Sequence, residues 1–430
     1  MSTEMERTVL GLIDEKEIVD FAVGFTDVFS PTGFEADAAN FCYEKYVKMG
    51  LRAKLQEISE ERFNAIGVLP GIGGGLHLMF NGHLDISHTG REGDVPGEKH
   101  SFARRQNLET EPLGLKTVVE EGWIRGNGIR NMKSAMAAYV GAVSAIIRSG
   151  VKLKGDIMIV AVAGEIEKAP VDDFQGREYR GYGEGTRYAL VHGGVADMCV
   201  LGEPTKFEVH LGNFGSLWLK LTARGDLVPT AWCDQVGNCI ESLSSLVKPL
   251  RNWIENYRER FSYFGRSPGV NIGAIQGGWP WRLSRTPTYC HLYLDIRYPP
   301  SVHPLDIIEE IKQVIRDEQK QNPALKVEIE PLVTMPPTEI PREMPVVQAI
   351  RKAHKSVLGD DPVETFHGPE TDAAHLNRYG IPTVIYGPAG RNRPGVADYV
   401  YGWQSIDDLV KAARVYALTA LDICMRERQS

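Results

Sequence analysis

The apolar run "GDIMIVAVAGE", residues 155–165, restricts the fold of this chain more than any other stretch. Every residue from 157 to 163 is apolar, whereas a strand with one face in water alternates apolar and polar side chains. Such a run is typical of a strand that helices cover on both faces. A helical pattern at 131–150 precedes it, and a second apolar run at 196–205 follows. This alternation predicts an α/β domain with a mixed, mostly parallel sheet between helices.

The pattern changes after residue 206. Strand and helix signals now follow in the order strand–helix–strand–strand–helix–strand, with one long helix expected at 234–261. That order suggests a smaller ferredoxin-like α+β domain. The first pattern returns after about residue 335. We therefore predict a discontinuous catalytic domain, residues 1–206 and 335–430, interrupted by a lid or dimerisation domain at 207–334.

Composition argues against several classes of protein. The 430-residue chain has a net charge of −8 and no basic cluster, which argues against a nucleic-acid binder. No apolar run approaches the ~20 residues that span a membrane, and the acidic N-terminus lacks the layout of a secretory signal. Six scattered cysteines form no C-x-x-C pair, which disfavours a cysteine zinc site and fits a reducing cytoplasm. We therefore expect a cytoplasmic protein that acts on a small molecule.

Polar side chains follow several of the apolar strands. His83 and Asp85 come after "LHLMF", Asn131 lies in "GNGIRNMKS", Glu165 ends the run described above, and Glu203 lies in "LGEPT". Ligands in open α/β sheets bind at the carboxyl ends of strands. One such cluster means little, but together they predict a shared site.

Two of these residues also have an ordinary structural explanation. A single histidine such as His83 is more often a hydrogen-bonded core residue than a ligand, and Glu165 alone could be a surface carboxylate. Asp85, two residues after His83, shares its strand face and can hold the imidazole in one tautomer, as partners of metal ligands do. Burial would raise the pKa of Glu165 toward the range of a general base. Glu203 also follows an apolar run, and a buried carboxylate needs hydrogen-bond donors or a cation such as a metal ion.

The order and spacing of these motifs resemble the metallohydrolase superfamily of aminoacylase, acetylornithine deacetylase, succinyl-diaminopimelate desuccinylase and glutamate carboxypeptidase. "GHLD" is similar to its metal-binding histidine with a supporting aspartate, "AGEIEK" to its paired glutamates, and "LGEPT" to a carboxylate ligand ahead of the lid. "RGNGIRNMKSAMAA" is similar to the turn that carries a metal-bridging aspartate, and "GVNIGAIQGG", "LDIRYPP" and "GPETDAAHLNRYGIPTVIYGP" resemble later motifs. The resemblance implies a metal-dependent hydrolase of C–N bonds. In it, His83 and Glu203 would bind metal, Asp85 would orient His83, and Glu165 would be the catalytic base.

The chain departs from this superfamily at positions that serve a second metal ion. The bridging aspartate is Asn131, and the second paired glutamate is Ile166. Pro394, or Arg393 if the alignment shifts by one, stands at the place of a late ligand histidine. Two cations about 3.5–4 Å apart need a negative bridge, which an asparagine does not supply. We therefore predict one divalent ion per chain, held by His83, Asn131 and Glu203. This relatively hard ligand set favours Mn²⁺, with Zn²⁺ or Co²⁺ as alternatives.

The substrate hypothesis depends on a further loss. The lid histidine of the superfamily, often supplied across a dimer, falls near Val228 or Pro229, so an amide oxyanion would lose stabilisation. A substrate that absorbs negative charge itself, such as an electron-poor aryl amine, would fit. The first hypothesis is hydrolytic deamination of an aromatic amino acid such as 5-nitroanthranilate, the reaction of an aminohydrolase in this superfamily. The alternatives are an amidohydrolase, deacylase or peptidase acting on N-acyl amino acids, and an inactive relative that binds a small molecule.

Candidate substrate-binding residues lie in the lid and late in the chain. The tryptophans of "GGWPWRLSR" could stack on an aromatic ring and its arginines could hold a carboxylate, or the tryptophans could merely pack the lid hairpin. The candidates are Arg297, Arg282, Trp281, Asn271, His367 and Glu370. The superfamily commonly dimerises through the lid, and an open strand edge at 210–221 could pair with its copy, so we expect a homodimer.

Overall fold

The computed structural model describes residues 4–87, 116–323, 325–391, 393–394 and 402–428. The chain divides into two compact units. Unit 1 contains residues 1–212, 340–365 and 371–430, and unit 2 contains residues 213–339 and 366–370. Residues 366–370 thus group with unit 2, whereas the sequence-based division places them in the catalytic domain. Strands β13 (Thr338–Glu339) and β14 (Glu364–His367) lie where the chain passes between the units.

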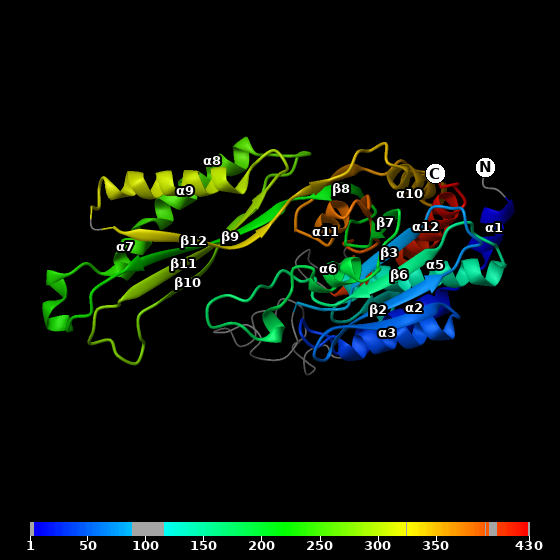
Figure 1. Ribbon diagram of the computed structural model, residues 1–430, viewed down its shortest axis with the longest axis horizontal. Helices are drawn as coiled ribbons and strands as arrows, with labels where there is room; N and C mark the ends of the chain where they lie inside the picture. Colours follow the sequence, from blue (N-terminus) through cyan, green and yellow to red (C-terminus); the bar gives the residue numbers. More distant parts are fainter. Residues whose placement is uncertain (1–3, 88–115, 324, 392, 395–401, 429–430) are drawn as a thin grey trace. The chain divides into compact units, whose positions relative to one another are not determined.

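Unit 1 is built on a mixed sheet with the strand order β1-β2-β6-β3-β7-β15-β8 (Figure 1). The central pairs β6–β3, β3–β7 and β7–β15 are parallel. The outer pairs β1–β2, β2–β6 and β15–β8 are antiparallel. The strands are β1 (Arg52–Ser59), β2 (Arg62–Leu69), β3 (Leu78–His83), β6 (Ile157–Val162), β7 (Met198–Leu201), β8 (Val209–Asn213) and β15 (Thr383–Ile385). The predicted α/β class, with a mixed sheet between helices, is confirmed.

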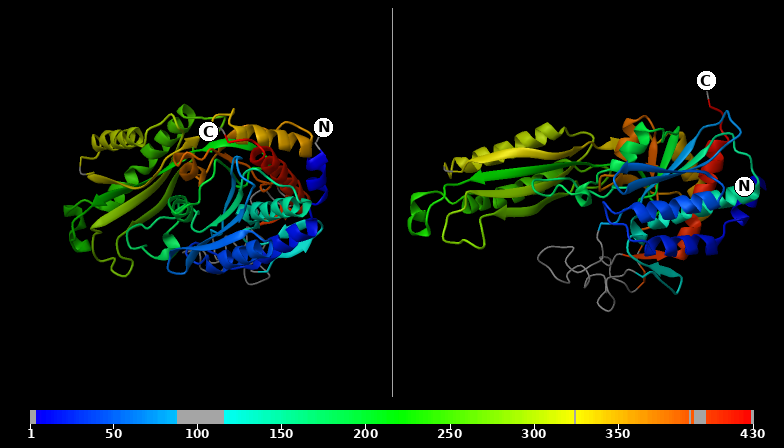
Figure 2. Two further views of the ribbon diagram at one scale, coloured as in Figure 1. Left: turned by 45° about the vertical axis from the view of Figure 1, so that its right-hand side comes forward. Right: turned by 60° about the horizontal axis from the view of Figure 1, so that its bottom comes forward.

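Side chains of the central strands alternate between two apolar layers of unit 1. The ribbons in Figure 2 show helices of unit 1 packed against its sheet. Phe80 on β3 and Ile159 on β6 belong to the larger layer, and Met79 and Val160 belong to the opposite one. The larger layer contains side chains from α1 (Glu4–Gly11), α2 (Glu15–Asp27), α3 (Ala36–Lys48), α5 (Ser134–Ser149), α10 (Pro345–Leu358) and α12 (Ile406–Cys424). The other contains side chains from α6 (Glu184–Val191) and α11 (Ala373–Arg378). Burial on both faces explains the unbroken apolar run at 157–163.

An irregular turn precedes α5. It is η1 (Ile129–Lys133), a π-helical turn in which Asn131 has non-helical φ and ψ of −131° and 99°. Gly128 enters the turn with φ +81°, a left-handed conformation that favours glycine. The Asn131–Met132 peptide bond is cis. Because η1 contacts β3, Asn131 lies near this strand. A small separate sheet has the order β16 (Trp403–Ser405), β5 (Trp123–Arg125) and β4 (Val118–Glu120).

Unit 2 is an antiparallel sheet with helices packed on it (Figure 1). Its strand order is β10 (Val270–Gly277), β11 (Tyr289–Tyr298), β9 (Gly215–Arg224) and β12 (Val327–Met335). Alternate residues of β11, such as Leu292 and Leu294, pack in an apolar core with α7 (Cys239–Ser245), α8 (Val247–Arg260) and α9 (Pro304–Gln319). The expected open edge at 210–221 is wrong for β9, because β11 and β12 flank that strand.

The single long helix expected at 234–261 is also wrong. The segment contains α7 and α8, which separate at Leu246, and it begins in the 3₁₀ turn η3 (Thr230–Gln235). Pro249 supplies a physical reason, because proline lacks an N–H and is favoured in the first turn of a helix. A helix therefore begins just before Pro249 rather than running through it.

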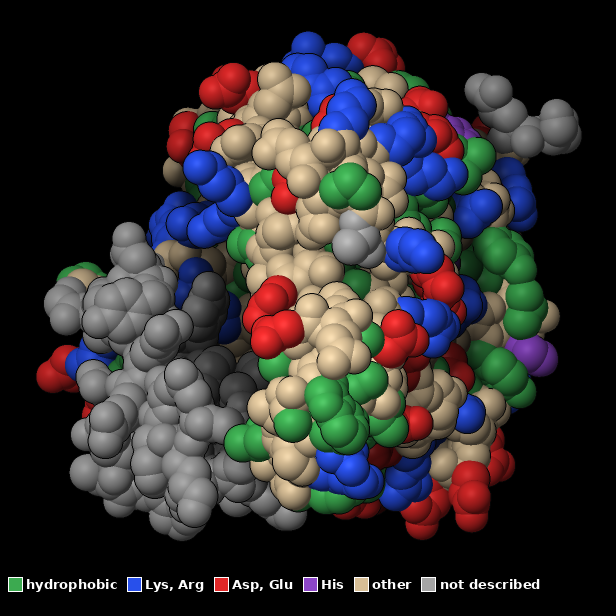
Figure 3. All heavy atoms as spheres, turned by 90° about the vertical axis from the view of Figure 1, so that its left-hand side faces the viewer, with side chains coloured by type: hydrophobic (Ala, Val, Ile, Leu, Met, Phe, Trp, Pro, Cys, Tyr) green, Lys and Arg blue, Asp and Glu red, His purple; other side chains and the backbone are tan. Residues whose placement is uncertain are grey.

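The surface carries mixed charges. On the face shown in Figure 3, acidic and basic side chains are interspersed. Unit 2 carries exposed pairs of this kind, such as Arg224 with Glu328 at 3.1 Å. None of the helices in the described part of the chain is long and apolar enough to cross a membrane.

Candidate metal centre

His83, at the end of β3, is the centre of a buried polar cluster. Its Nδ1 donates a hydrogen bond to the backbone carbonyl of Asp85 at 2.8 Å, which leaves the lone pair on Nε2. Nε2 lies 3.3 Å from Asn131 Oδ1, 3.6 Å from Glu165 Oε2 and 3.9 Å from Glu203 Oε1. The fold thus brings together His83, Glu165 and Glu203, which follow separate apolar strands. It adds Asn131, which precedes α5.

Neighbouring strand ends account for this convergence. β3 pairs in parallel with β6 on one side and with β7 on the other, with His83 opposite Val162 and Asn81 opposite Leu201. Glu165 follows β6 and Glu203 follows β7, so both carboxylates leave the sheet at the edge where His83 lies.

The cluster can hold a metal ion. One donor atom each of His83, Glu165 and Glu203 lie within 4.8 Å of one another, and all three residues are buried. Glu203 Oε1 is buried and accepts no hydrogen bond from the part of the chain that the structure describes. Burial raises the pKa of Glu203; His83 opposes this shift, and the charges of Asp85 and Glu167 add to it. A divalent cation would offset these crowded negative charges, so the residues present fit a metal ion.

Asp85 connects His83 to Glu165. Its Oδ1 accepts the backbone N–H of Glu165 at 3.0 Å, and its Oδ2 accepts the N–H of Ile166 at 3.2 Å and the hydroxyl of Thr32 at 2.8 Å. The carboxylate was expected to hold the imidazole, but its Oδ1 is 3.6 Å from His83 Nδ1. The backbone carbonyl orients the imidazole instead, while the carboxylate fixes the start of the segment after β6.

Two further carboxylates, Glu167 and Asp372, lie near the cluster. Glu167 acts on Glu203 through its charge, and its position two residues after Glu165 in "GEIE" is a signal that could have found it. Asp372 accepts the hydroxyl of Thr186 at 2.7 Å through Oδ2, and burial raises its pKa to about 7. Asp372 lies in "GPETDAAH", part of a stretch that resembles a later motif of the superfamily, so the sequence does point to it as a residue that lines or supports the site.

His375, the third residue of α11, makes a structural contact. Its Nε2 is 3.0 Å from the carbonyl of Tyr182. Burial lowers its pKa to about 4, so the imidazole is neutral at physiological pH.

The predicted substrate-binding residues of the lid belong to unit 2. Arg297 donates to Asp295 at 2.8 Å, and Asn271 lies opposite Asp295 in the β10–β11 pair. Trp281 has 78% of its surface exposed, which contradicts the alternative that it packs the lid hairpin. Arg282 is exposed as well.

His367 and Glu370 are buried in the segment 366–370, which groups with unit 2. The polar cluster around His83 lies in unit 1. A role for these two residues and for the lid residues in substrate binding therefore stays a prediction.

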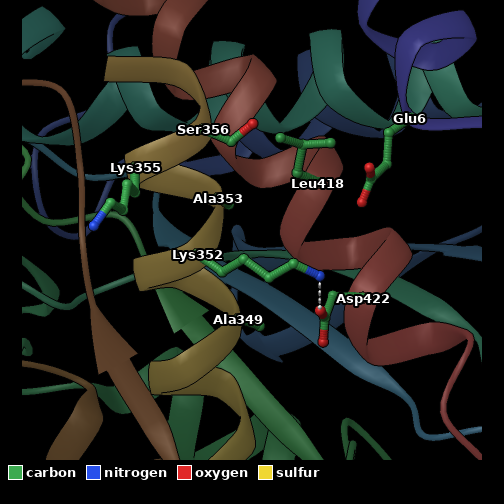
Figure 4. Close-up of a pocket in the computed structure, with 8 residues that line it drawn as sticks. All are labelled: Glu6, Ala349, Lys352, Ala353, Lys355, Ser356, Leu418 and Asp422. Atoms are coloured by element: carbon green, nitrogen blue, oxygen red, sulfur yellow. Dashed lines mark hydrogen bonds and ion pairs between the residues drawn. The ribbon is translucent and has the colours of Figure 1, made fainter. Parts of the chain in front are cut away.

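A hollow of about 300 Å³ opens between α10 and α12 (Figure 4). Lys352 and Asp422 meet at its wall in an ion pair of 3.1 Å, and Ala349 and Leu418 contribute apolar surface. None of its lining residues belongs to the polar cluster around His83.

Residues 79–422 of the chain match peptidase family M20/M25/M40. This range includes His83, Asn131, Glu165 and Glu203. The chain belongs to this family. It is 22% identical over 404 residues to the N-formyl-4-amino-5-aminomethyl-2-methylpyrimidine deformylase of Halalkalibacterium halodurans, covering 86% of each chain. It is 24% identical over 351 residues to a succinyl-diaminopimelate desuccinylase of Alkalilimnicola ehrlichii, covering 79% of this chain and 82% of that one. A dinuclear metal binding peptidase of family M20 from Bacillus subtilis has the same fold, with a TM-score of 0.62, 11% identity and coverage of 95% and 98%.

Membership in the M20/M25/M40 family confirms the predicted metallohydrolase superfamily and an enzyme that acts on C–N bonds. It also confirms the coarser expectation of a divalent metal cofactor.

Proposed function

We propose that this M20 protein is a single-metal hydrolase in which Glu165 is the general base. The observation that carries the proposal is the convergence of Asn131 Oδ1, Glu165 Oε2 and Glu203 Oε1 within 3.9 Å of His83 Nε2. When bound, a divalent ion would lower the pKa of a water molecule and polarise the bond under attack. His83, Glu203 and Asn131 would hold this ion.

Glu165 moves the proton in this scheme. Its carboxylate takes a proton from the attacking water and delivers it to the leaving nitrogen. Asp85 holds the backbone of Glu165 through the hydrogen bond to its N–H. The water oxygen bonds to the electrophilic carbon, the C–N bond breaks, and the nitrogen leaves as an amine or as ammonia.

The proposal of one ion depends on the substituted ligand positions. Asn131 is neutral, Ile166 cannot bind a cation, and the backbone N–H of Ile166 is engaged by Asp85. A ligand set of one imidazole, one carboxylate and one amide oxygen favours Mn²⁺ over metals that prefer soft ligands such as thiolates. The Bacillus subtilis relative is a dinuclear metal binding peptidase, so the number of metal ions per chain should differ between the two proteins.

Two substrate classes are proposed in order. The first is an electron-poor aromatic amino acid such as 5-nitroanthranilate, in which water replaces the amino group and ammonia leaves. The exposed Trp281 and Arg282 support this choice, because a ring can stack on an indole and a carboxylate can pair with a guanidinium. The second is an N-acyl amine or N-acyl amino acid, which the names of the deformylase and desuccinylase relatives favour.

The test measures the released product. Purified protein loaded with Mn²⁺ is incubated with 5-nitroanthranilate and, separately, with N-succinyl and N-formyl amines. Ammonia release supports the first class, and release of succinate or formate supports the second. Turnover of none of them with Mn²⁺, Zn²⁺ or Co²⁺ would favour an inactive binding protein.

A cytoplasmic homodimer is also part of the proposal. The described cysteines are all free, as a reducing compartment requires. β10 is an edge strand of unit 2 with exposed side chains such as Ile275, and such an edge can pair with a second copy. Sedimentation at several protein concentrations tests the assembly.

A further inference from the structure

Arg62, the first residue of β2, is a charged side chain that the fold encloses completely. Its Nε and Nη2 donate to the two carboxylate oxygens of Glu35 at 3.0 and 2.7 Å, and its side chain has no exposed surface. Nη1 donates to Glu184, and Nη2 also donates to the carbonyl of Arg180 at 3.0 Å. Replacing such a buried ion cluster with apolar side chains is often neutral or stabilising. Stability alone therefore does not account for it.

The guanidinium lies against Gly164, the residue before Glu165. A Cβ placed on Gly164 would lie 2.4 Å from Arg62 Nη2 and 2.8 Å from the carbonyl oxygen of Arg180, so Arg62 fills the space that a side chain would need. The carbonyl of Gly164 accepts the N–H groups of Gly183 at 2.9 Å and Glu184 at 3.1 Å. Arg62 thus contacts both ends of the segment 164–184.

A second contact runs from the same cluster to Asp85. Glu35 accepts the N–H of Gly33 at 2.8 Å, and Thr32, one residue earlier, donates its hydroxyl to Asp85 at 2.8 Å. Asp85 in turn accepts the N–H of Glu165. The segment 32–35 therefore connects the Arg62 cluster to the carboxylate that fixes Glu165.

We propose that Arg62 is a positioning residue for Glu165, an inference that rests on the proposed role of Glu165 as the general base. The planar fork of Arg62 holds Gly164 and the closing residues of the segment 164–184 in one arrangement, which sets the direction of the Glu165 side chain. In the described residues, the hydrogen bonds of the Arg62 side chain go to Glu35, Glu184 and Arg180, not to His83 or Glu203, so we expect its replacement to disturb Glu165 more than metal binding.

The test is a double-mutant cycle between Arg62→Lys and Glu165→Gln, with Mn²⁺ as the metal and the substrate class identified above. Lysine keeps the charge but loses the fork. We expect Arg62→Lys to lower kcat on the order of 100-fold, as a misplacement of about 1 Å can. KM and the Mn²⁺ content per chain should stay at wild-type values. In the Glu165→Gln background, Arg62→Lys should lower kcat no further, because both changes remove the same function.

Arg148→Lys is the matched control. Arg148 also pairs with a partly buried glutamate, Glu17, at 2.8 Å, but it contacts neither Glu165 nor the segment 164–184 in the described chain. It should leave kcat unchanged. If Arg62→Lys does not fold, Glu184→Gln takes its place in the cycle, since the Glu184 side chain is 27% exposed and tolerates change better. An equal loss of kcat in both backgrounds, or an unchanged kcat in the wild-type background, overturns the inference. Full activity of Glu165→Gln instead overturns the proposed function.

Discussion

Asp85 Oδ1 accepts the backbone N–H of Glu165 at 3.0 Å, while the backbone carbonyl of Asp85 accepts the Nδ1–H of His83 at 2.8 Å. One residue therefore fixes both the tautomer of His83, the proposed metal ligand, and the start of the segment that carries the proposed base. Losing its carboxylate should affect the base more directly than the ligand.

The first prediction concerns this carboxylate. Asp85→Asn removes one of two charged oxygens that accept backbone N–H groups, and we expect kcat to fall about 10–100-fold, as for other partners of metal-site residues. Steady-state kinetics with Mn²⁺ measure the change. Thr32→Val, which removes only the hydroxyl contact to Asp85, should have a smaller effect. Equal effects of the two substitutions would contradict this ranking.

The second prediction concerns metal content. The wild-type protein should contain one equivalent of Mn²⁺ per chain after saturation and desalting, as measured by elemental analysis. His83→Ala should lose this ion, because the imidazole is the central donor of the cluster. His192→Ala serves as the control, since His192 bonds to the carbonyl of Tyr188 outside the cluster. Two equivalents in the wild-type protein would contradict the single-ion proposal.

The third prediction concerns pH. Burial raises the pKa of Asp372 to about 7 from an ordinary value of 3.8, so the folded metal-free protein binds this proton more tightly than the unfolded chain does. The unfolded state then holds fewer protons, and the free energy of unfolding should fall as pH rises from about 4 to 7, by about 3 kcal/mol. Urea unfolding of metal-free protein across this range measures it. Asp372→Asn should flatten the dependence, and an unchanged slope in that variant would contradict the assignment.

The fourth prediction concerns the core of unit 1. Phe80 is fully buried, and its ring centroid lies 4.7 Å from that of Tyr139 and 5.6 Å from that of Tyr416. Phe80→Ala should therefore lower the free energy of unfolding by about 3–5 kcal/mol. Phe34→Ala, at a side chain that is 40% exposed, should cost far less in the same urea titration.

The fifth prediction separates binding from stability at Trp281. Because 78% of its surface is exposed, Trp281→Ala should change the free energy of unfolding by less than about 0.5 kcal/mol. If the indole stacks on an aromatic substrate, KM should rise about 2- to 10-fold, which corresponds to a ring contact of roughly 0.5–1.5 kcal/mol. An unchanged KM for 5-nitroanthranilate would remove Trp281 from the binding site.

Much of the site could be predicted because it depends on strand ends. The apolar runs before Glu165 and before Glu203 predict buried parallel strands, and His83 follows a third apolar run. Partners that are distant in sequence could not be found in this way. Arg62 looks like an ordinary surface residue, since arginine is rarely buried unless it is paired, and Glu35 and Glu184 become its partners only in the folded chain.

Errors in the fold have a local and a non-local cause. The expected helix at 234–261 is divided at Leu246, and Pro249 is the local cause, because proline has no N–H to donate inside a continuous helix. The expected open edge of β9 depends on which strands flank it, and that is decided by pairing with β11 and β12 far along the chain.

The place of β15 in the sheet has a consequence for biosynthesis. β15 pairs with β7 through Thr383 and Cys199, and with β8 through Ile385 and His210, so the sheet of unit 1 is incomplete until these late residues have left the ribosome. Most of unit 2 is one continuous stretch, residues 213–339, and emerges earlier. The inserted unit is thus available for folding before its host, and a nascent chain that ends near residue 340 would expose the unpaired flanks of β7 and β8 to chaperones.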